Sequence, residues 1–182
     1  MWKWFNMAFP VLLAALWLVG CGQPPVESED EKLPFSQNLL NPGDAAGIRG
    51  SQPGDSPEEV RVRETFTLNE DSDSLLVYTG QLDFDESSVS ITVFYNFDEF
   101  GLFEFQFDLR PESRSGAKVL HDQLKEFLTA QYGEPKQPGT ALRFTSFSPS
   151  NNVVEITLSD ESTEVGTPFV SLNFLEPLDD EI

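Results

Sequence analysis

The chain of 182 residues contains 11 Lys or Arg and 31 Asp or Glu, which gives a formal net charge of −20 at pH 7. A surface this acidic repels nucleic-acid phosphates and anionic lipid headgroups, so neither is an expected partner. The single cysteine excludes an intrachain disulfide and a cysteine-based metal cluster. The length fits one domain, and the 16 Phe residues supply enough apolar bulk for its core.

Residues 1–20 have the layout of a secretory signal peptide. Lys3 lies near the start, an apolar run extends from Phe9 to Val19, and the small residue Gly20 precedes Cys21. The run is shorter than the about 20 apolar residues that a membrane-spanning helix needs. We therefore expect a leader that is removed, with an ordinary secreted protein or an uncleaved N-terminal anchor as the alternatives.

The end of this leader, Leu18-Val19-Gly20-Cys21, resembles the lipobox of bacterial lipoproteins. The resemblance implies that signal peptidase recognises Leu18, Val19 and Gly20, cleaves after Gly20, and leaves an acylated Cys21 as the first residue. Each buried acyl methylene contributes about 0.8 kcal/mol, so two or three chains hold a protein on a bilayer. Because Gly22 follows the cysteine, the family's sorting habit implies an outer-membrane protein facing the periplasm in a cell with two membranes, and otherwise a cell-surface protein.

Residues 21–55 have the composition of a flexible tether, rich in Pro, Gly, Ser and acidic residues and without a sustained apolar period. About 35 such residues have a root-mean-square reach of about 30 Å. One apolar patch, Pro34–Leu40, is the exception, and it could dock on the domain or on a partner.

A single α+β domain is predicted over residues 56–176. Ser56, Pro57 and Glu59 form the pattern of a capping box with proline at the first helical position, which predicts a short helix from Pro57 to about Glu64. A strand is the competing interpretation, because apolar residues from Val60 to Leu68 share one parity.

Three segments with alternating apolar residues then predict antiparallel strands, at 74–84, 88–97 and 102–110. Gly80 is a candidate β-bulge in the first. The turn at 98–101 joins the other two as a hairpin.

An amphipathic helix is predicted over 116–133, with Ser115 as its N-cap and Gly133 at its end. Three more strands follow, at 141–147, 153–159 and 169–175, and residues 177–182 form a frayed acidic tail. The predicted fold is an antiparallel sheet of about six strands, covered on one face by one long amphipathic helix, with a short N-terminal helix.

The segments Gly54–Val60 and Leu124–Pro135 together resemble a class of small, mostly uncharacterised bacterial secreted or lipoprotein domains, over about residues 47–175. The first segment is also similar to small outer-membrane assembly lipoproteins of the SmpA type. Those are shorter and pair their helices before the sheet, an order from which this chain departs. Neither resemblance implies a catalytic residue or a cofactor.

Two features of the sequence are candidate chemical sites. Asn69, Asp71 and Asp73 have the spacing that opens an EF-hand loop, but Ser74 and Gly80 stand where the loop needs Gly and Glu, so they are weak calcium ligands at best. The only histidine, His121, lies at the edge of the predicted helix's apolar stripe, without a nucleophile or metal-ligand pattern beside it.

The sequence therefore predicts a lipid-anchored envelope lipoprotein, a non-enzymatic binding module outside the cytoplasm. Its expected partners are the bilayer, through acylated Cys21, and another envelope protein or envelope component. The alternatives are a carboxylate-based hydrolase and a weak calcium-binding module. The sequence leaves the ligand and the oligomeric state open.

Overall fold

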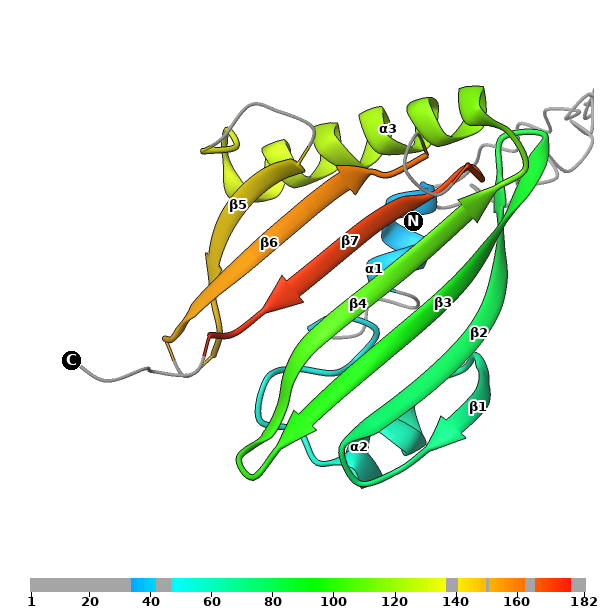
Figure 1. The fold of residues 1–182 in the computed structure, drawn as a ribbon. Coiled ribbons are helices and arrows are strands. Elements are labelled where there is room, and N and C mark those ends of the chain that lie inside the picture. Colours follow the sequence, from blue (N-terminus) through cyan, green and yellow to red (C-terminus); the bar gives the residue numbers. More distant parts are fainter. Residues whose placement is uncertain (1–33, 42–46, 137–140, 150, 163–165, 178–182) are drawn as a thin grey trace, which may run out of the picture. The chain divides into compact units, whose positions relative to one another are not determined.

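The computed structural model describes residues 34–41, 47–136, 141–149, 151–162 and 166–177 (Figure 1). The predicted leader, the lipobox with Cys21 and the acidic tail from residue 178 lie outside the described residues. The chain divides into two units, Met1–Lys32 and Leu33–Ile182, and the second contains every described residue. All residues of the described core belong to this second unit, so it has the hydrophobic core of an independently folding domain.

The second unit is built on one antiparallel sheet of seven strands in the order β1-β2-β3-β4-β7-β6-β5. The described helices are α1 (Phe35–Leu40), α2 (Pro57–Arg63) and α3 (Arg114–Tyr132). The strands are β1 (Thr67–Asp71), β2 (Leu75–Phe84), β3 (Ser87–Asp98), β4 (Gly101–Pro111), β5 (Ala141–Phe147), β6 (Val153–Asp160) and β7 (Val170–Leu175).

The predicted α+β class with an antiparallel sheet is confirmed, and six of the strands match the predicted segments. The sheet has seven strands rather than about six. The additional strand, β1, pairs with β2 at the sheet edge, and all five of its residues are exposed. A strand exposed on both faces has no apolar alternation, which is the signal that identified the others.

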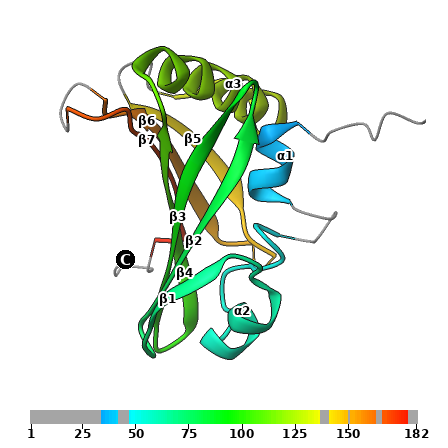
Figure 2. The ribbon, with the colours of Figure 1, turned by 90° about the vertical axis from the view of Figure 1, so that its right-hand side faces the viewer.

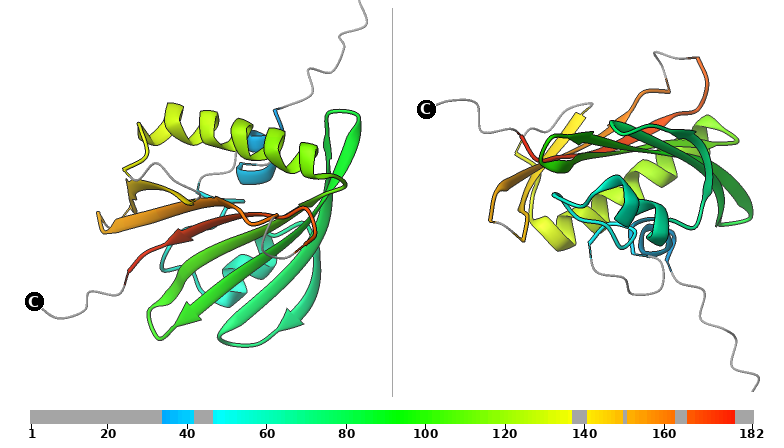
Figure 3. Two further views of the ribbon diagram at one scale, coloured as in Figure 1. Left: turned by 45° about the horizontal axis from the view of Figure 1, so that its top comes forward. Right: turned by 90° about the horizontal axis from the view of Figure 1, so that it is seen from below.

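Strands β2, β3 and β4 form a meander, after which α3 carries the chain to the opposite edge of the sheet. Strands β5 and β6 then return it to β7, which pairs with β4. Figures 2 and 3 show the three helices on the same side of the sheet. Helix α3 packs against β4, β5, β6 and β7, whereas α1 packs against β2, so the long helix shares the buried face with a shorter one.

Helix α1 lies inside the predicted tether but belongs to the folded domain, so the predicted N-terminal boundary at residue 56 is wrong. Its residues Phe35, Leu39 and Leu40 are buried in the core, and the Phe35 ring packs edge-on against Phe84, with 5.1 Å between centroids. The apolar patch of the predicted tether therefore docks on the domain itself. The described fold begins at residue 34 rather than 56, because this patch packs against β2 and its apolar side chains are buried in the core.

Gly80 is not a bulge, since the ladder between β2 and β3 runs without a register shift across it. A Cβ atom at this position would lie 2.3 Å from the ring of Phe66. Glycine is needed here because an aromatic ring packs directly on the strand backbone.

The helix termini follow local chemistry. In α2, the Ser56 hydroxyl accepts from the Glu59 amide while the Glu59 carboxylate accepts from the Ser56 amide, so the predicted capping box is confirmed. In α3 the N-cap is Ser113 rather than the predicted Ser115, because Ser113 Oγ accepts from the Gly116 amide at 3.0 Å. The helix ends at Gly133, which has the positive φ of 82° that favours glycine.

The two serines at the start of α3 give a direct test. We expect Ser113→Ala to lower the free energy of unfolding by about 1 kcal/mol, because an amide of the first turn loses its acceptor. Ser115→Ala should cost clearly less, since the Ser115 hydroxyl bonds to the Ser113 hydroxyl rather than to a backbone amide of the first turn. Urea denaturation of the chain from residue 22 measures both, and a larger loss for Ser115→Ala would contradict the assignment.

Candidate functional site

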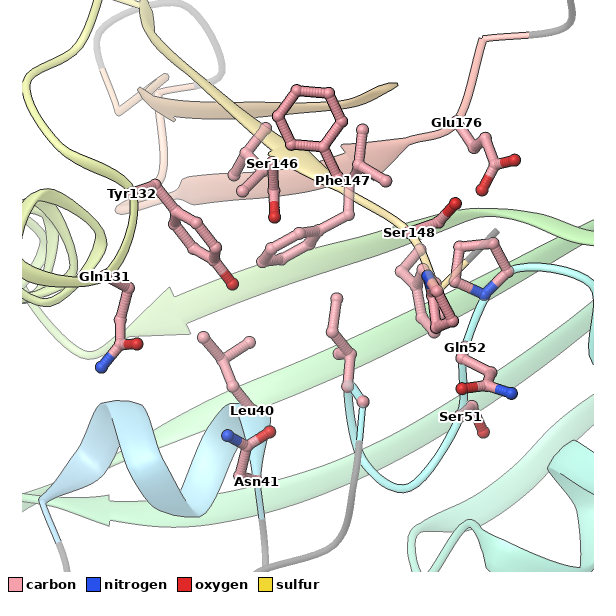
Figure 4. Close-up of a pocket in the computed structure, with 18 of the residues that line it drawn as sticks. Leu40, Asn41, Ser51, Gln52, Gln131, Tyr132, Ser146, Phe147, Ser148 and Glu176 are labelled. Carbon is pink, nitrogen blue, oxygen red and sulfur yellow. The ribbon is translucent and has the colours of Figure 1, made fainter. Parts of the chain in front are cut away.

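A cavity of about 710 Å³ lies between the sheet, the end of α3 and the N-terminal segment (Figure 4). Its lining comes from parts of the chain that are far apart in sequence. The described lining residues are Gln37, Leu40, Asn41, Gly47, Ile48, Ser51, Gln52, Pro53, Phe103, Phe105, Phe127, Gln131, Tyr132, Ser146, Phe147, Ser148, Pro149, Val154, Ile156, Phe174 and Glu176.

The apolar lining from the sheet follows from strand alternation. Phe105, Phe174 and Ile156 lie in β4, β7 and β6, and they form directly opposed pairs across these strands. All three are at most 2% exposed. Side chains of opposed residues point to the same face of a sheet, so register alone brings these three together.

The end of α3 and the hairpin of β5 and β6 form the outer part of the cavity. Gln131 and Tyr132 come from the last turn of α3, and Ser146 and Phe147 from the end of β5 (Figure 4). Phe147 is 64% exposed and lies opposite Val153, which is 44% exposed. The cavity therefore opens to solvent beside exposed apolar side chains.

The N-terminal wall, which comprises α1 and residues 47–53, is held in place by Arg49. This side chain is buried, and its guanidinium makes two hydrogen bonds of 2.7 Å to the Glu64 carboxylate. It also donates to the Leu39 carbonyl at 3.0 Å and stacks 3.9 Å above the Phe66 ring. The Arg49 backbone has a positive φ of 52°, and its amide donates to the Leu40 carbonyl. One side chain thus joins α1, the end of α2 and the start of β1.

Glu64 is the acceptor at the centre of this network. Its Oε1 accepts from the amides of Thr65 and Phe66, and its Oε2 accepts from the hydroxyl of Tyr95. Burial would raise the pKa of Glu64, but the hydrogen bonds and charge of Arg49, together with the Tyr95 hydroxyl, outweigh it and lower that pKa. Burial and the Glu64 charge raise the pKa of Tyr95 well above its usual value.

A second ion pair fixes the turn that follows the wall. Asp55 is buried, pairs with Arg63 and accepts from the Gln52 amide at 2.9 Å. Its backbone carbonyl accepts from the Leu102 amide, which attaches the turn to β4. Gly101 is required there, because it has a φ of 116° and its Cβ would lie 2.5 Å from the Gly54 oxygen.

The cavity wall combines apolar side chains with polar ones, and most of the polar ones are uncharged. Of the described lining residues, Glu176 is the only one with a charged side chain. Its Oε1 accepts from Asn152, while its Oε2 is screened from solvent and has no hydrogen-bond partner among the described residues. The buried Ser51 hydroxyl is likewise unpartnered within the described part of the chain. Burial raises the pKa of Tyr132.

The weak calcium candidates are not brought together. Asn69 lies in β1 and donates to Thr79, and Asp71 pairs with Arg61 at 2.6 Å. Asp73 is exposed in the turn that follows. Among the described residues, no three His, Cys, Asp or Glu side chains gather in a group that could hold a metal ion.

His121 lies on α3 with a side-chain exposure of 15%, and its Nδ1 is 3.7 Å from Asp122. It is more buried than predicted, since we expected it at the solvent-exposed edge of the helix. Its Nε2 has no hydrogen-bond partner among the described residues. It does not line the cavity.

Sequence reasoning missed the cavity, the buried Arg49–Glu64 pair and the pairing of the buried Asp55 with Arg63. One signal was present, since the apolar patch Pro34–Leu40 was recognised as a segment able to dock. Arg49 carried no such signal, because it stands among Gly, Ser, Gln and Pro residues that are typical of a loop.

Comparison with known proteins finds no matching family model, no similar curated protein and no similar solved structure. The resemblances drawn from the lipobox and from the Gly54–Val60 and Leu124–Pro135 segments therefore stay predictions. Within the described ranges, no helix is long and apolar enough to span a membrane.

The network behind the N-terminal wall predicts a particular pH dependence. The lowered pKa of Glu64 means that its contribution to stability is present above its unfolded pKa of about 4.3. That contribution is lost as the pH falls through the lowered value in the folded state. We expect the free energy of unfolding to fall more steeply below about pH 4.3 in the wild type than in Glu64→Gln.

At neutral pH, Glu64→Gln should cost roughly 3–5 kcal/mol, because it leaves the buried Arg49 guanidinium without its counter-charge. Glu58→Gln is the matched control, since Glu58 pairs with Arg61 at 3.0 Å but its side chain is 85% exposed. Urea denaturation across this pH range measures all three proteins. Equal losses for the two variants would show that the Arg49–Glu64 pair is not the main interaction holding this segment.

Proposed function

We propose that this chain is a lipid-anchored, extracytoplasmic binding protein, and that the cavity between α1, α3 and the sheet is its ligand site. The observation that carries the proposal is the cavity itself. Its volume of about 710 Å³ falls among ligand pockets, which have about 300–1,000 Å³ and mostly apolar walls with a few polar groups.

The contents of the cavity favour binding over catalysis. Hydrolysis by two carboxylates needs a pair at a defined separation, and the described lining contains a single carboxylate, Glu176. Tyr132, the other titratable side chain of the lining, comes from the end of α3, away from Glu176 in the close-up (Figure 4).

The leader and Cys21 support the anchor. With the fold beginning at residue 34, the segment between Cys21 and the domain is 22–33. Its root-mean-square reach is about 20 Å if it behaves as a flexible chain. The cavity wall formed by α1 then lies directly beyond a short tether, which keeps the site close to the membrane surface.

Blocking the cavity tests the ligand site. We expect Nile red, a neutral apolar dye, to bind the chain from residue 22 saturably and with increased fluorescence. Ser146 lies in the cavity wall opposite Val154, so Ser146→Phe should weaken this binding about tenfold or more by filling the space. Fluorescence titration gives both dissociation constants.

Thr145→Phe is the matched control, because it adds the same ring to the neighbouring residue of β5, which faces the other side of the sheet. Thermal melting checks that both variants fold. Dye binding that is as strong in folded Ser146→Phe as in Thr145→Phe would refute the cavity as the ligand site.

The anchor is tested separately in bacteria that express the full chain. Cys21→Ser should lose both acyl labelling and the cleaved form, because the thiol that receives the lipid is absent. Gly22→Ser leaves that thiol in place and should be labelled like the wild type. Metabolic labelling with a fatty acid followed by gel electrophoresis measures this, and a labelled Cys21→Ser protein would refute lipidation at this site.

A further inference from the structure

The charge of the cavity is set by one side chain. Glu176 immediately follows β7, and its amide donates to the Phe103 carbonyl at 2.9 Å, which fixes its backbone beside the cavity. No Lys, Arg or His is found among the described lining residues, so the Glu176 charge is not neutralised from within the lining. One oxygen of the carboxylate, Oε2, is screened from solvent, although the residue as a whole is only half-buried.

The carboxylate also has unused hydrogen-bonding capacity. Only one of its oxygens, Oε1, accepts a hydrogen bond from a described residue, Asn152. The terminal torsion of a glutamate side chain is soft, so the second oxygen can turn toward a donor placed in the cavity.

The aromatic part of the wall suits an apolar group attached to a cation. Aromatic rings from β4, β5, β7 and α3 surround the space, and aromatic faces attract cations. They belong to Phe103, Phe105, Phe127, Tyr132, Phe147 and Phe174. The formal net charge of −20 favours approach of a cation and disfavours an anion, such as a fatty acid.

We propose that the ligand of this cavity is a hydrophobic amine, a small molecule in which a protonated amino group is joined to an aromatic or branched aliphatic group. The amino group pairs with the Glu176 carboxylate, and the apolar group occupies the space between the aromatic side chains. This inference rests on the proposed function, since it names the ligand class of the same cavity.

Three indole compounds of similar size and shape differ in the charge of their terminal group, so they separate the effect of charge on binding from the effect of shape. Tryptamine carries an amine, tryptophol a hydroxyl and indole-3-propionate a carboxylate on the same two-carbon chain. The three tryptophans of the protein, Trp2, Trp4 and Trp17, all precede Cys21. The chain from residue 22 has no indole of its own, so the emission of each compound reports its transfer into an apolar site.

We expect tryptamine to bind about tenfold more tightly than tryptophol, because both can donate a hydrogen bond to the Glu176 carboxylate but only the ammonium group adds the attraction between opposite charges. Indole-3-propionate should bind more weakly than either. Glu176→Gln should abolish the preference for tryptamine, because it weakens tryptamine binding more than tryptophol binding.

Glu155→Gln is the matched control, since it removes the same charge from an exposed residue of β6 that does not line the cavity. It should keep the preference for tryptamine. A preference that falls equally in both variants would mean that overall negative charge, rather than Glu176, selects the amine, and would overturn the proposal.

The two levels of inference fail in different ways. Suppose that Ser146→Phe weakens Nile red binding but that tryptamine binds no better than tryptophol. The cavity is then a ligand site, and the amine proposal is wrong. If Ser146→Phe leaves Nile red binding unchanged, the ligand site is wrong. Tryptamine that binds equally well to folded Ser146→Phe also overturns the amine proposal, because it then binds elsewhere.

Discussion

The candidate site depends on the buried ion pair between Arg49 and Glu64. Removing two charges from water is costly, and such a pair is tolerated only where the remaining donors and acceptors also find partners. Here Arg49 contacts the Leu39 carbonyl and the Phe66 ring, and Glu64 accepts from two backbone amides and from Tyr95. Because these partners belong to α1, to the segment between α2 and β1, and to β3, the pair fixes the position of the N-terminal wall.

This arrangement gives the N-terminal segment two roles in the proposed protein. Residues 34–41 and 47–53 form a wall of the cavity, and residues 22–33 are all that separates that wall from Cys21. Fully extended, 12 residues span at most about 43 Å, which in the proposed lipoprotein bounds the distance between Cys21 and the start of α1. Replacing Glu64 is expected to loosen the wall, and therefore to affect ligand binding as well as stability.

The sequence was sufficient for several features that depend on neighbours along the chain. The capping box at Ser56 and the six alternating strands are local patterns, and they were identified correctly. Helix α1 has only six residues, too few to show a helical period. The N-cap of α3 was assigned to Ser115, two residues after the actual cap, Ser113. The cavity could not be predicted, because its lining combines segments whose proximity is decided by strand register and by the burial of Arg49.

A contrast between two carboxylates in this domain supports a structural role for Glu64 and a ligand-binding role for Glu176. Glu64 and Glu176 each have oxygens screened from solvent, but Glu64 has a counter-charge and hydrogen bonds to both oxygens, whereas Glu176 Oε2 has no partner among the described residues. An unsatisfied buried polar group costs about 1–3 kcal/mol, and native structures contain few of them. The network of Glu64 is complete without a ligand, whereas Glu176 Oε2 is free of described partners and can accept a hydrogen bond from one. That difference is why Glu176, rather than the more deeply buried Glu64, is the residue that we assign to ligand recognition.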